Sequence, residues 1–216
     1  KWGLCGSSLL SGPRERLFRK PFSAGRHAPL RRLSAALLRE RKPGASRSKG
    51  KEYEDALVWL QNAGLIYKVS LCQTPQVPLK SYEDLSIFKI YCLDVGLLRV
   101  LSEVSPEAYF NDNPAFKEFK GALAENYVLQ SLTASGVKCS RYWASGNKAE
   151  VEFIIQEGLD IIPIEVKSGT SVTGKSLVEY NKKYSPKLRL RFSMLNMKKD
   201  DTFVNMPLFM ADRAKS

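Results

Sequence analysis

The sequence has few of the residues that build zinc sites, disulfide scaffolds or membrane-spanning helices. Its four cysteines are scattered with none in a CxxC pair, and His27 is its single histidine. Zinc sites draw on clustered cysteines and histidines, so we expect none. Scattered thiols in a chain of this length are typical of a reducing, cytoplasmic location. No apolar run reaches the roughly 18 residues that indicate a transmembrane helix, so we expect no membrane partner.

Acidic residues are scarce at the beginning of the chain. Residues 1–50 contain thirteen Lys or Arg but only two Glu, and they supply nearly all of the net charge of +12. The Arg, Ser, Gly and Pro content predicts a disordered basic tail with one short helix over Leu30–Arg41. Such a tail can contact DNA or RNA phosphates without sequence preference. The alternatives are a solvated tail without a partner, or a segment that is not native to the domain.

From residue 51 the apolar pattern becomes regular. Apolar residues at helical spacing end at Gly64, a residue type that commonly stops helices. We predict a helix to residue 63, strands over 65–71 and 88–91, and a helix over 95–101 capped by Asp94. This order favours a winged-helix-like region over residues 51–113, of a kind that binds DNA or a neighbouring domain. Its nearly neutral charge argues against strong DNA binding by itself.

The second half of the chain predicts a sheet flanked by helices. A polar linker over residues 102–114 separates it from the first region. The pattern then predicts a helix over 116–134, strands over 138–144, 149–155 and 161–169, a helix over 174–184, a strand over 188–195 and a last short element over 203–210. The second helix allows a parallel crossover, whereas the central pair forms an antiparallel hairpin. We therefore predict an α+β protein, with its main domain over residues 114–216.

Charged residues inside this central hairpin point to chemistry. Side chains alternate between the faces of a strand, so Glu165 and Lys167 share one side. The hairpin can bring Glu152 to the same end of the sheet. Charged side chains in apolar strands cost free energy unless they are paired or bind a metal. The ordinary alternative is an ion pair on a solvent-exposed edge, which contributes little.

The acid before Phe153-Ile154-Ile155, followed by Ile164-Glu165-Val166-Lys167, resembles the PD-(D/E)xK restriction-endonuclease-like superfamily. A closer resemblance covers about residues 51–200, to the uncharacterised C-terminal region of a bacterial and archaeal AAA-type ATPase family. The stretches that carry it are Lys51–Leu60, Ala63–Val69, Pro78–Lys80, Phe88–Leu98, Gly121–Asn126 and Pro163–Gly169. The ATPase domain of that family is absent from the sequence, so we expect a fragment or a truncated copy.

The resemblance implies a site and a fold. It implies a restriction-endonuclease-like mixed sheet, with Mg²⁺ or Mn²⁺ held by Glu152 and Glu165 for phosphodiester hydrolysis. Glu125 would complete or orient the metal ligands, and Lys167 would steady the attacking hydroxide or the phosphate charge. The family usually has Asp where this chain has Glu152. A non-catalytic alternative keeps the same fold for docking an ATPase, another partner or a second copy of the chain.

A third interpretation concerns Gly169–Ser176, which fits the GxxxxGK[ST] pattern of phosphate-binding loops and lies between a predicted strand and a helix. This spacing would predict ATP binding. About 40 residues follow, which is short for the rest of such a domain. No apolar strand ending in Asp follows either, and Glu165 would lie in what should be an apolar central strand. We therefore rank ATP binding below the other two hypotheses.

Overall fold

The computed structural model describes residues 47–104, 116–146, 149–170 and 173–214. The basic tail up to residue 46, with its predicted helix over Leu30–Arg41, and most of the polar linker lie outside these residues. The described helices are α2 (Arg47–Asn62), α3 (Val95–Leu101), α5 (Lys117–Ala134) and α6 (Lys175–Tyr184), with 3₁₀ turns η1 (Leu79–Tyr82) and η3 (Leu208–Arg213). The described strands are β1 (Ile66–Leu71), β2 (Asp84–Cys92), β3 (Arg141–Ala144), β4 (Glu150–Glu157), β5 (Asp160–Val166), β6 (Arg189–Ser193), β7 (Lys198–Asp200) and β8 (Phe203–Pro207).

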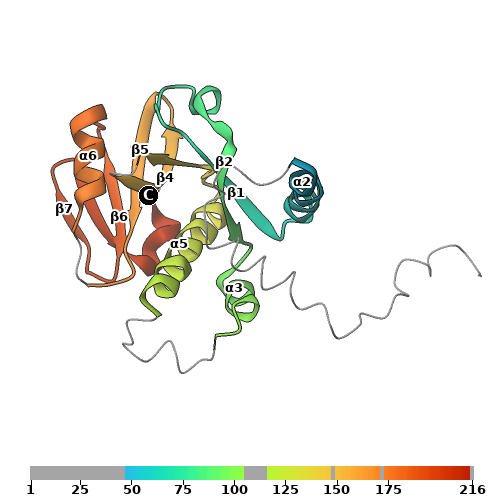
Figure 1. Cartoon of the computed structure of the whole chain (residues 1–216). Helices are drawn as coiled ribbons and strands as arrows, with labels where there is room; N and C mark the ends of the chain where they lie inside the picture. The colour runs from blue at the N-terminus through green and yellow to red at the C-terminus, as the bar shows by residue number, and fades with distance from the viewer. Residues whose placement is uncertain (1–46, 105–115, 147–148, 171–172, 215–216) are drawn as a thin grey trace, which may run out of the picture.

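All of these strands form one mixed sheet in the order β2-β1-β3-β4-β5-β6-β8-β7. Helix α5 and the turn η3 pack on one face, over a core that includes Val128, Leu132 and Phe153. Helix α6 covers the other face through Leu177 and Tyr180 (Figure 1). The predicted α+β class and the mixed sheet flanked by helices are confirmed.

The helix boundaries follow local chemistry. Gly64 and Gly136 lie two residues after the ends of α2 and α5, with φ angles of +71° and +80°, a backbone region that glycine adopts without strain. The Asp94 carboxylate accepts a hydrogen bond of 2.9 Å from the backbone N–H of Leu97, as expected of a helix cap. The predicted helix stop at Gly64 and the predicted cap at Asp94 are confirmed, although α2 begins at Arg47 and so overlaps the predicted tail.

The central hairpin and the crossover also follow the prediction. Strands β4 and β5 pair antiparallel from Glu157↔Asp160 to Phe153↔Ile164, around a turn at Gly158. Strands β5 and β6 then pair in parallel across α6. Strand β2 begins at Asp84, four residues earlier than predicted. The short strand β7 was not predicted, because its three exposed residues carry no apolar pattern.

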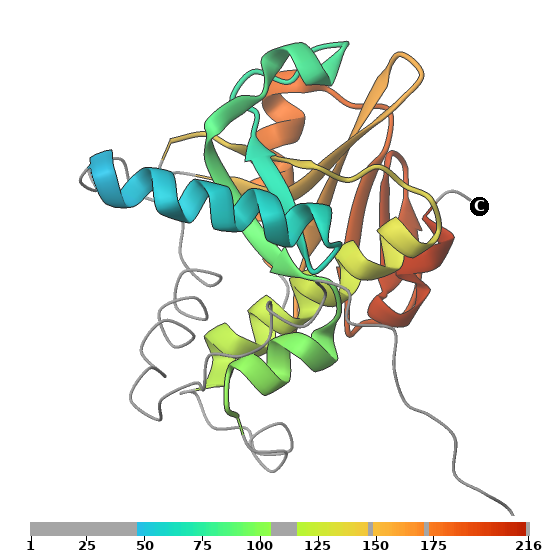
Figure 2. The same cartoon turned by 90° about the vertical axis from the view of Figure 1, so that its right-hand side faces the viewer.

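The region predicted to be winged-helix-like shares a sheet and a core with the second half of the chain. Ser70 and Leu71 of β1 pair in parallel with β3. Val69 and Tyr91 belong to the same buried cluster as α5. Figure 2 shows α2 lying across the β1–β2 hairpin. The described residues on either side of the linker therefore pack as one body, which the local pattern of residues 51–113 did not indicate.

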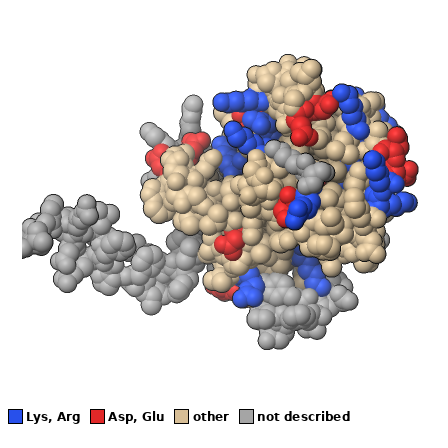
Figure 3. Space-filling model, turned by 180° about the vertical axis from the view of Figure 1, so that it is seen from behind, with Lys and Arg blue, Asp and Glu red and all other residues tan. Residues whose placement is uncertain are grey.

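The described surface has mixed charge. Figure 3 shows one face, on which Lys and Arg side chains form small groups near Asp and Glu, with wide uncharged areas between them. This distribution agrees with the near balance of acids and bases after residue 50. Among the described helices, none has the length and apolar content needed to cross a membrane.

Candidate active site

The strands β4 and β5 separate at Glu152, and this separation creates the site. Their ladder ends at Phe153↔Ile164, and the pairing of β4 with β3 shifts register close to Glu152. The backbone N–H of Val166 therefore has no strand partner on this side, and it donates a 3.1 Å hydrogen bond to Oε2 of Glu152. The Glu152 carboxylate thus lies in the fork between the two strands.

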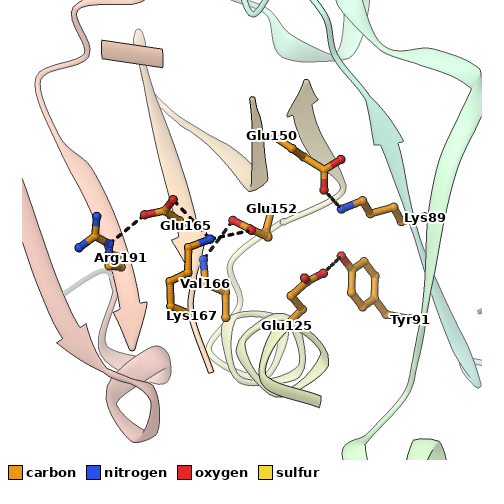
Figure 4. A network of polar contacts seen from close by, with 9 residues as sticks. All are labelled: Lys89, Tyr91, Glu125, Glu150, Glu152, Glu165, Val166, Lys167 and Arg191. Atoms are coloured by element: carbon orange, nitrogen blue, oxygen red, sulfur yellow. Dashed lines mark hydrogen bonds and ion pairs between the residues drawn. The ribbon is translucent and has the colours of Figure 1, made fainter. Parts of the chain in front are cut away.

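The fork brings three predicted site residues into contact (Figure 4). Nζ of Lys167 lies 3.5 Å from Oε1 of Glu152 and 3.4 Å from Oε1 of Glu165. Glu152 is buried, and Glu165 is fully buried with 0% of its surface exposed. The predicted convergence of these residues at one end of the hairpin is confirmed as geometry. The solvent-exposed ion pair that we considered as the alternative is wrong for Glu165, because its carboxylate lies in the interior.

A fourth residue, Arg191, completes the arrangement and was not predicted. It is the register partner of Glu165 on β6, and its Nε donates a 2.8 Å hydrogen bond to Oε2 of Glu165. Its guanidinium lies 4.8 Å from the ring centroid of Phe203. An arginine between Leu190 and Phe192 in a predicted apolar strand was the sequence signal for it. We refer to Glu152, Glu165, Lys167 and Arg191 as the buried charge cluster.

The packing around Arg191 gives Gly174 a role unrelated to nucleotide binding. A Cβ atom at position 174 would lie 2.0 Å from Nη2 of Arg191. Any side chain at this second glycine of the GxxxxGK[ST] pattern would therefore require the Arg191 guanidinium to move. Residues 171 and 172 of the pattern lie outside the described residues, so its loop geometry is not part of the described structure.

Burial and neighbouring charges shift the pKa values in the fork. Burial raises the pKa of Glu152 to about 7, against the opposing effect of Lys167 and with a further increase from Glu125. Burial alone would lower the pKa of Lys167, but the carboxylates of Glu152 and Glu165 raise it above its ordinary value. Lys167 therefore stays charged at neutral pH, whereas Glu152 exchanges a proton readily.

Glu125, the fourth predicted site residue, joins the site from α5. Its Oε2 accepts a 2.9 Å hydrogen bond from the Tyr91 hydroxyl, and its charge contributes to the raised pKa of Glu152. Burial raises the pKa of Glu125 itself, although Lys89 and the Tyr91 hydrogen bond oppose this effect. The structure thus places Glu125 beside the fork, with Tyr91 of β2 as its hydrogen-bond partner.

The carboxylates in the fork offer only a few oxygen ligands for a cation. Among the described residues, no group of three or more His, Cys, Asp and Glu side chains is arranged to hold a metal ion. Two carboxylate oxygens nevertheless face the same group. Oε1 of Glu152 and Oε1 of Glu165 both lie next to the Lys167 ammonium. The Glu165 oxygen is buried, and the Lys167 ammonium at 3.4 Å is its ion-pair partner. A divalent cation that binds both oxygens must therefore displace this ammonium.

Two families of unknown function match the chain. Residues 120–209, which contain all four predicted site residues, match a domain of unknown function (DUF4143). This domain is commonly found in AAA-ATPase-associated proteins. Residues 22–108 match a second domain of unknown function (DUF8612). No curated protein and no solved structure matches the chain.

Proposed function

We propose that this chain is a module of an ATPase-associated protein and that it hydrolyses phosphodiester bonds in nucleic acid with the help of Mg²⁺ or Mn²⁺. The observation that carries the proposal is the convergence of Glu152 and Glu165 on a single cationic position, held by the Lys167 ammonium at 3.5 Å and 3.4 Å. Among the described residues, Cys72, Cys92 and Cys139 are free and buried, which suits a reducing cytoplasm.

The donor atoms fit a hard divalent cation. Mg²⁺ is commonly held by one or two carboxylates, with water and substrate phosphate completing its ligands. Glu152 and Glu165 supply two such oxygens, and the absence of a third ligand among the described residues is compatible with this mode. The ammonium of Lys167 already lies between the two oxygens, so a metal must compete with it.

Hydrogen bonds from neighbouring protein groups orient both carboxylates of the fork. Arg191 holds Oε2 of Glu165, and the N–H of Val166 holds Oε2 of Glu152, so each carboxylate turns its Oε1 toward Lys167. A bound divalent ion would polarise the phosphodiester and acidify its attacking water. Lys167, once separated from the carboxylates, can stabilise the negative charge that develops on the phosphate.

Replacing Glu165 with glutamine is expected to weaken Mn²⁺ binding at least tenfold, which corresponds to about 1.4 kcal/mol. The substitution keeps the size of the side chain but removes the buried anionic oxygen. Calorimetric titration of the whole chain with Mn²⁺, and then Mg²⁺, measures the effect. Glu157→Gln, on the exposed end of β4, is the matched control and should bind as the parent does. A folded parent chain that binds neither ion would contradict the proposed function.

Replacing Lys167 with methionine is expected to separate binding from hydrolysis. Because the ammonium competes for the two carboxylate oxygens, the variant should bind Mn²⁺ more tightly than the parent. Because it lacks the charge that faces the phosphate, it should cleave supercoiled plasmid more slowly by a factor on the order of 10². Gel electrophoresis of plasmid incubated with saturating Mn²⁺ measures the second effect. Equal cleavage rates in parent and variant would remove Lys167 from the reaction.

A non-catalytic interaction module is the second candidate, and exposed apolar side chains on α2 favour it. Val58 and Trp59 are adjacent on this helix, with 52% and 66% of their surfaces exposed. Apolar exposure of this kind is typical of docking surfaces, and an ATPase domain is the partner that the family association suggests. Docking requires neither Lys167 nor a metal, so calorimetry and plasmid cleavage distinguish the two candidates.

A further inference from the structure

The β1–β2 hairpin reaches the predicted site from the side opposite Arg191 (Figure 4). Lys89 and Tyr91 are two residues apart on β2 and therefore share a face of the strand. The Tyr91 hydroxyl donates a 2.9 Å hydrogen bond to Oε2 of Glu125. The Tyr91 ring also packs against Phe153, the residue that follows Glu152, with 5.5 Å between centroids. Tyr91 thus contacts both the helix acid and the strand that forms the fork.

Lys89 ties the same hairpin to β4. Its side chain has 15% of its surface exposed, and its ammonium pairs with Glu150. The ammonium also lies 4.9 Å from the ring centroid of Tyr142. Burial alone would lower the pKa of Lys89, but the carboxylates of Glu125 and Glu150 raise it above the ordinary value. A charged Lys89 therefore fixes β2 against β4 and keeps Tyr91 beside Glu125.

Packing alone does not require these polar groups. A buried ion pair usually stabilises a fold no better than apolar residues of the same size. On β1, by contrast, the tyrosine and lysine do not contact carboxylates of the described residues in this way. Tyr67 is the cross-strand partner of Tyr91, and Lys68 contacts the Phe88 ring and the Leu85 carbonyl. The pairing of hairpin residues with carboxylates is thus specific to β2, where it faces the fork.

We propose that Tyr91 is a positioning residue that acts through Glu125, so that the site is built jointly by the two matched regions. Tyr91 lies within residues 22–108, whereas Glu125 and the buried charge cluster lie within residues 120–209. The inference rests on the proposed function. By holding Oε2 of Glu125, Tyr91 fixes the direction in which this carboxylate faces Glu152. Partners that orient metal-site carboxylates are typically worth tenfold to a hundredfold in metal affinity or activity.

The test compares Tyr91→Phe with Tyr67→Phe in the whole chain, because each substitution removes only one hydroxyl. Calorimetry with Mn²⁺ alone and plasmid cleavage at saturating Mn²⁺ are the two measurements. We expect Tyr91→Phe to lower affinity or cleavage rate by about tenfold or more, and Tyr67→Phe to stay within about twofold of the parent. Circular dichroism at the assay temperature checks that both variants are folded.

A double-mutant cycle with Glu125→Leu, which has no oxygen to accept the Tyr91 hydrogen bond, separates positioning from a general structural effect. If Tyr91 acts through Glu125, adding Tyr91→Phe to Glu125→Leu should cause little further loss. Fully additive losses would overturn the inference, as would equal Mn²⁺ affinity and cleavage in Tyr91→Phe and Tyr67→Phe. A parent chain that binds no Mn²⁺ would overturn the proposed function together with this inference. A parent that binds Mn²⁺ without any effect of Tyr91→Phe would overturn this inference alone.

Discussion

Replacing Arg191 with leucine is expected to lower the free energy of unfolding by about 3–5 kcal/mol. The substitution removes the guanidinium whose Nε lies 2.8 Å from Oε2 of Glu165. Glu165 has none of its surface exposed, so its charge would remain in the interior with Lys167 as the remaining cation. Breaking a buried pair by removing one partner costs more than the pair contributes, because the remaining charge stays desolvated. Urea denaturation in the presence of a chelator measures the change.

Arg189→Leu provides the matched control for this prediction. Arg189 lies on the same strand and hydrogen-bonds to the hydroxyl of Thr202, so its loss leaves no buried carboxylate unpaired. We expect it to cost less than about 1.5 kcal/mol. The double variant Arg191→Leu/Glu165→Leu should recover most of the stability lost in Arg191→Leu, because it removes the unpaired charge. A single Arg191→Leu variant as stable as Arg189→Leu would contradict the buried pair.

Glu152 is expected to make the protein less stable as the pH rises from 5 to 8. Its pKa in the folded state is raised from about 4.5 to about 7. Between these values the folded state binds more protons than the unfolded state, so the free energy of unfolding falls with increasing pH. A pKa difference of this size between the folded and unfolded states corresponds to about 3–4 kcal/mol. This contribution is fully present below about pH 4.5 and is lost by about pH 7–8.

Glu152→Gln should remove this part of the pH dependence. The amide oxygen of glutamine can still accept the hydrogen bond from the N–H of Val166. The comparison is made between the metal-free parent and the variant by urea denaturation at pH 5 and pH 8. A smaller dependence should remain in the variant, because burial also raises the pKa of Glu125. Glu157→Gln is the exposed control, and a parent curve that overlays the Glu152→Gln curve would contradict the prediction.

The reactive half of the site was predictable because its residues are close in sequence and follow strand alternation. Glu165 and Lys167 share a face of one strand, and a tight turn after β4 brings β5 back beside it. What the alternation did not show was the break in pairing at Phe153. Because the pairing stops here, the Glu152 side chain enters the fork between the strands. The N–H of Val166 then donates a hydrogen bond to the Glu152 carboxylate.

The supporting half of the site was missed because its contacts join distant parts of the chain. Arg191 lies 26 residues from Glu165, and Tyr91 lies 34 residues from Glu125. Lys89 and Glu150 are 61 residues apart. Such contacts depend on strand order, which local periodicity does not determine. The parallel pairing of β1 with β3 is the decisive example, because it places β2 near β4 and gives the first region a share of the site.

The continuity of the sheet has a consequence for how the protein unfolds and how it can be divided. The described residues of the two matched regions share one apolar core, so their loss of structure should be a single cooperative transition. A fragment that begins after the linker would leave β3 as an unpaired edge and uncover the apolar side chains that Val69 and Tyr91 contact. Unpaired edges of this kind promote aggregation. We therefore expect the described parts of the two regions to fold as one unit and not as independent domains.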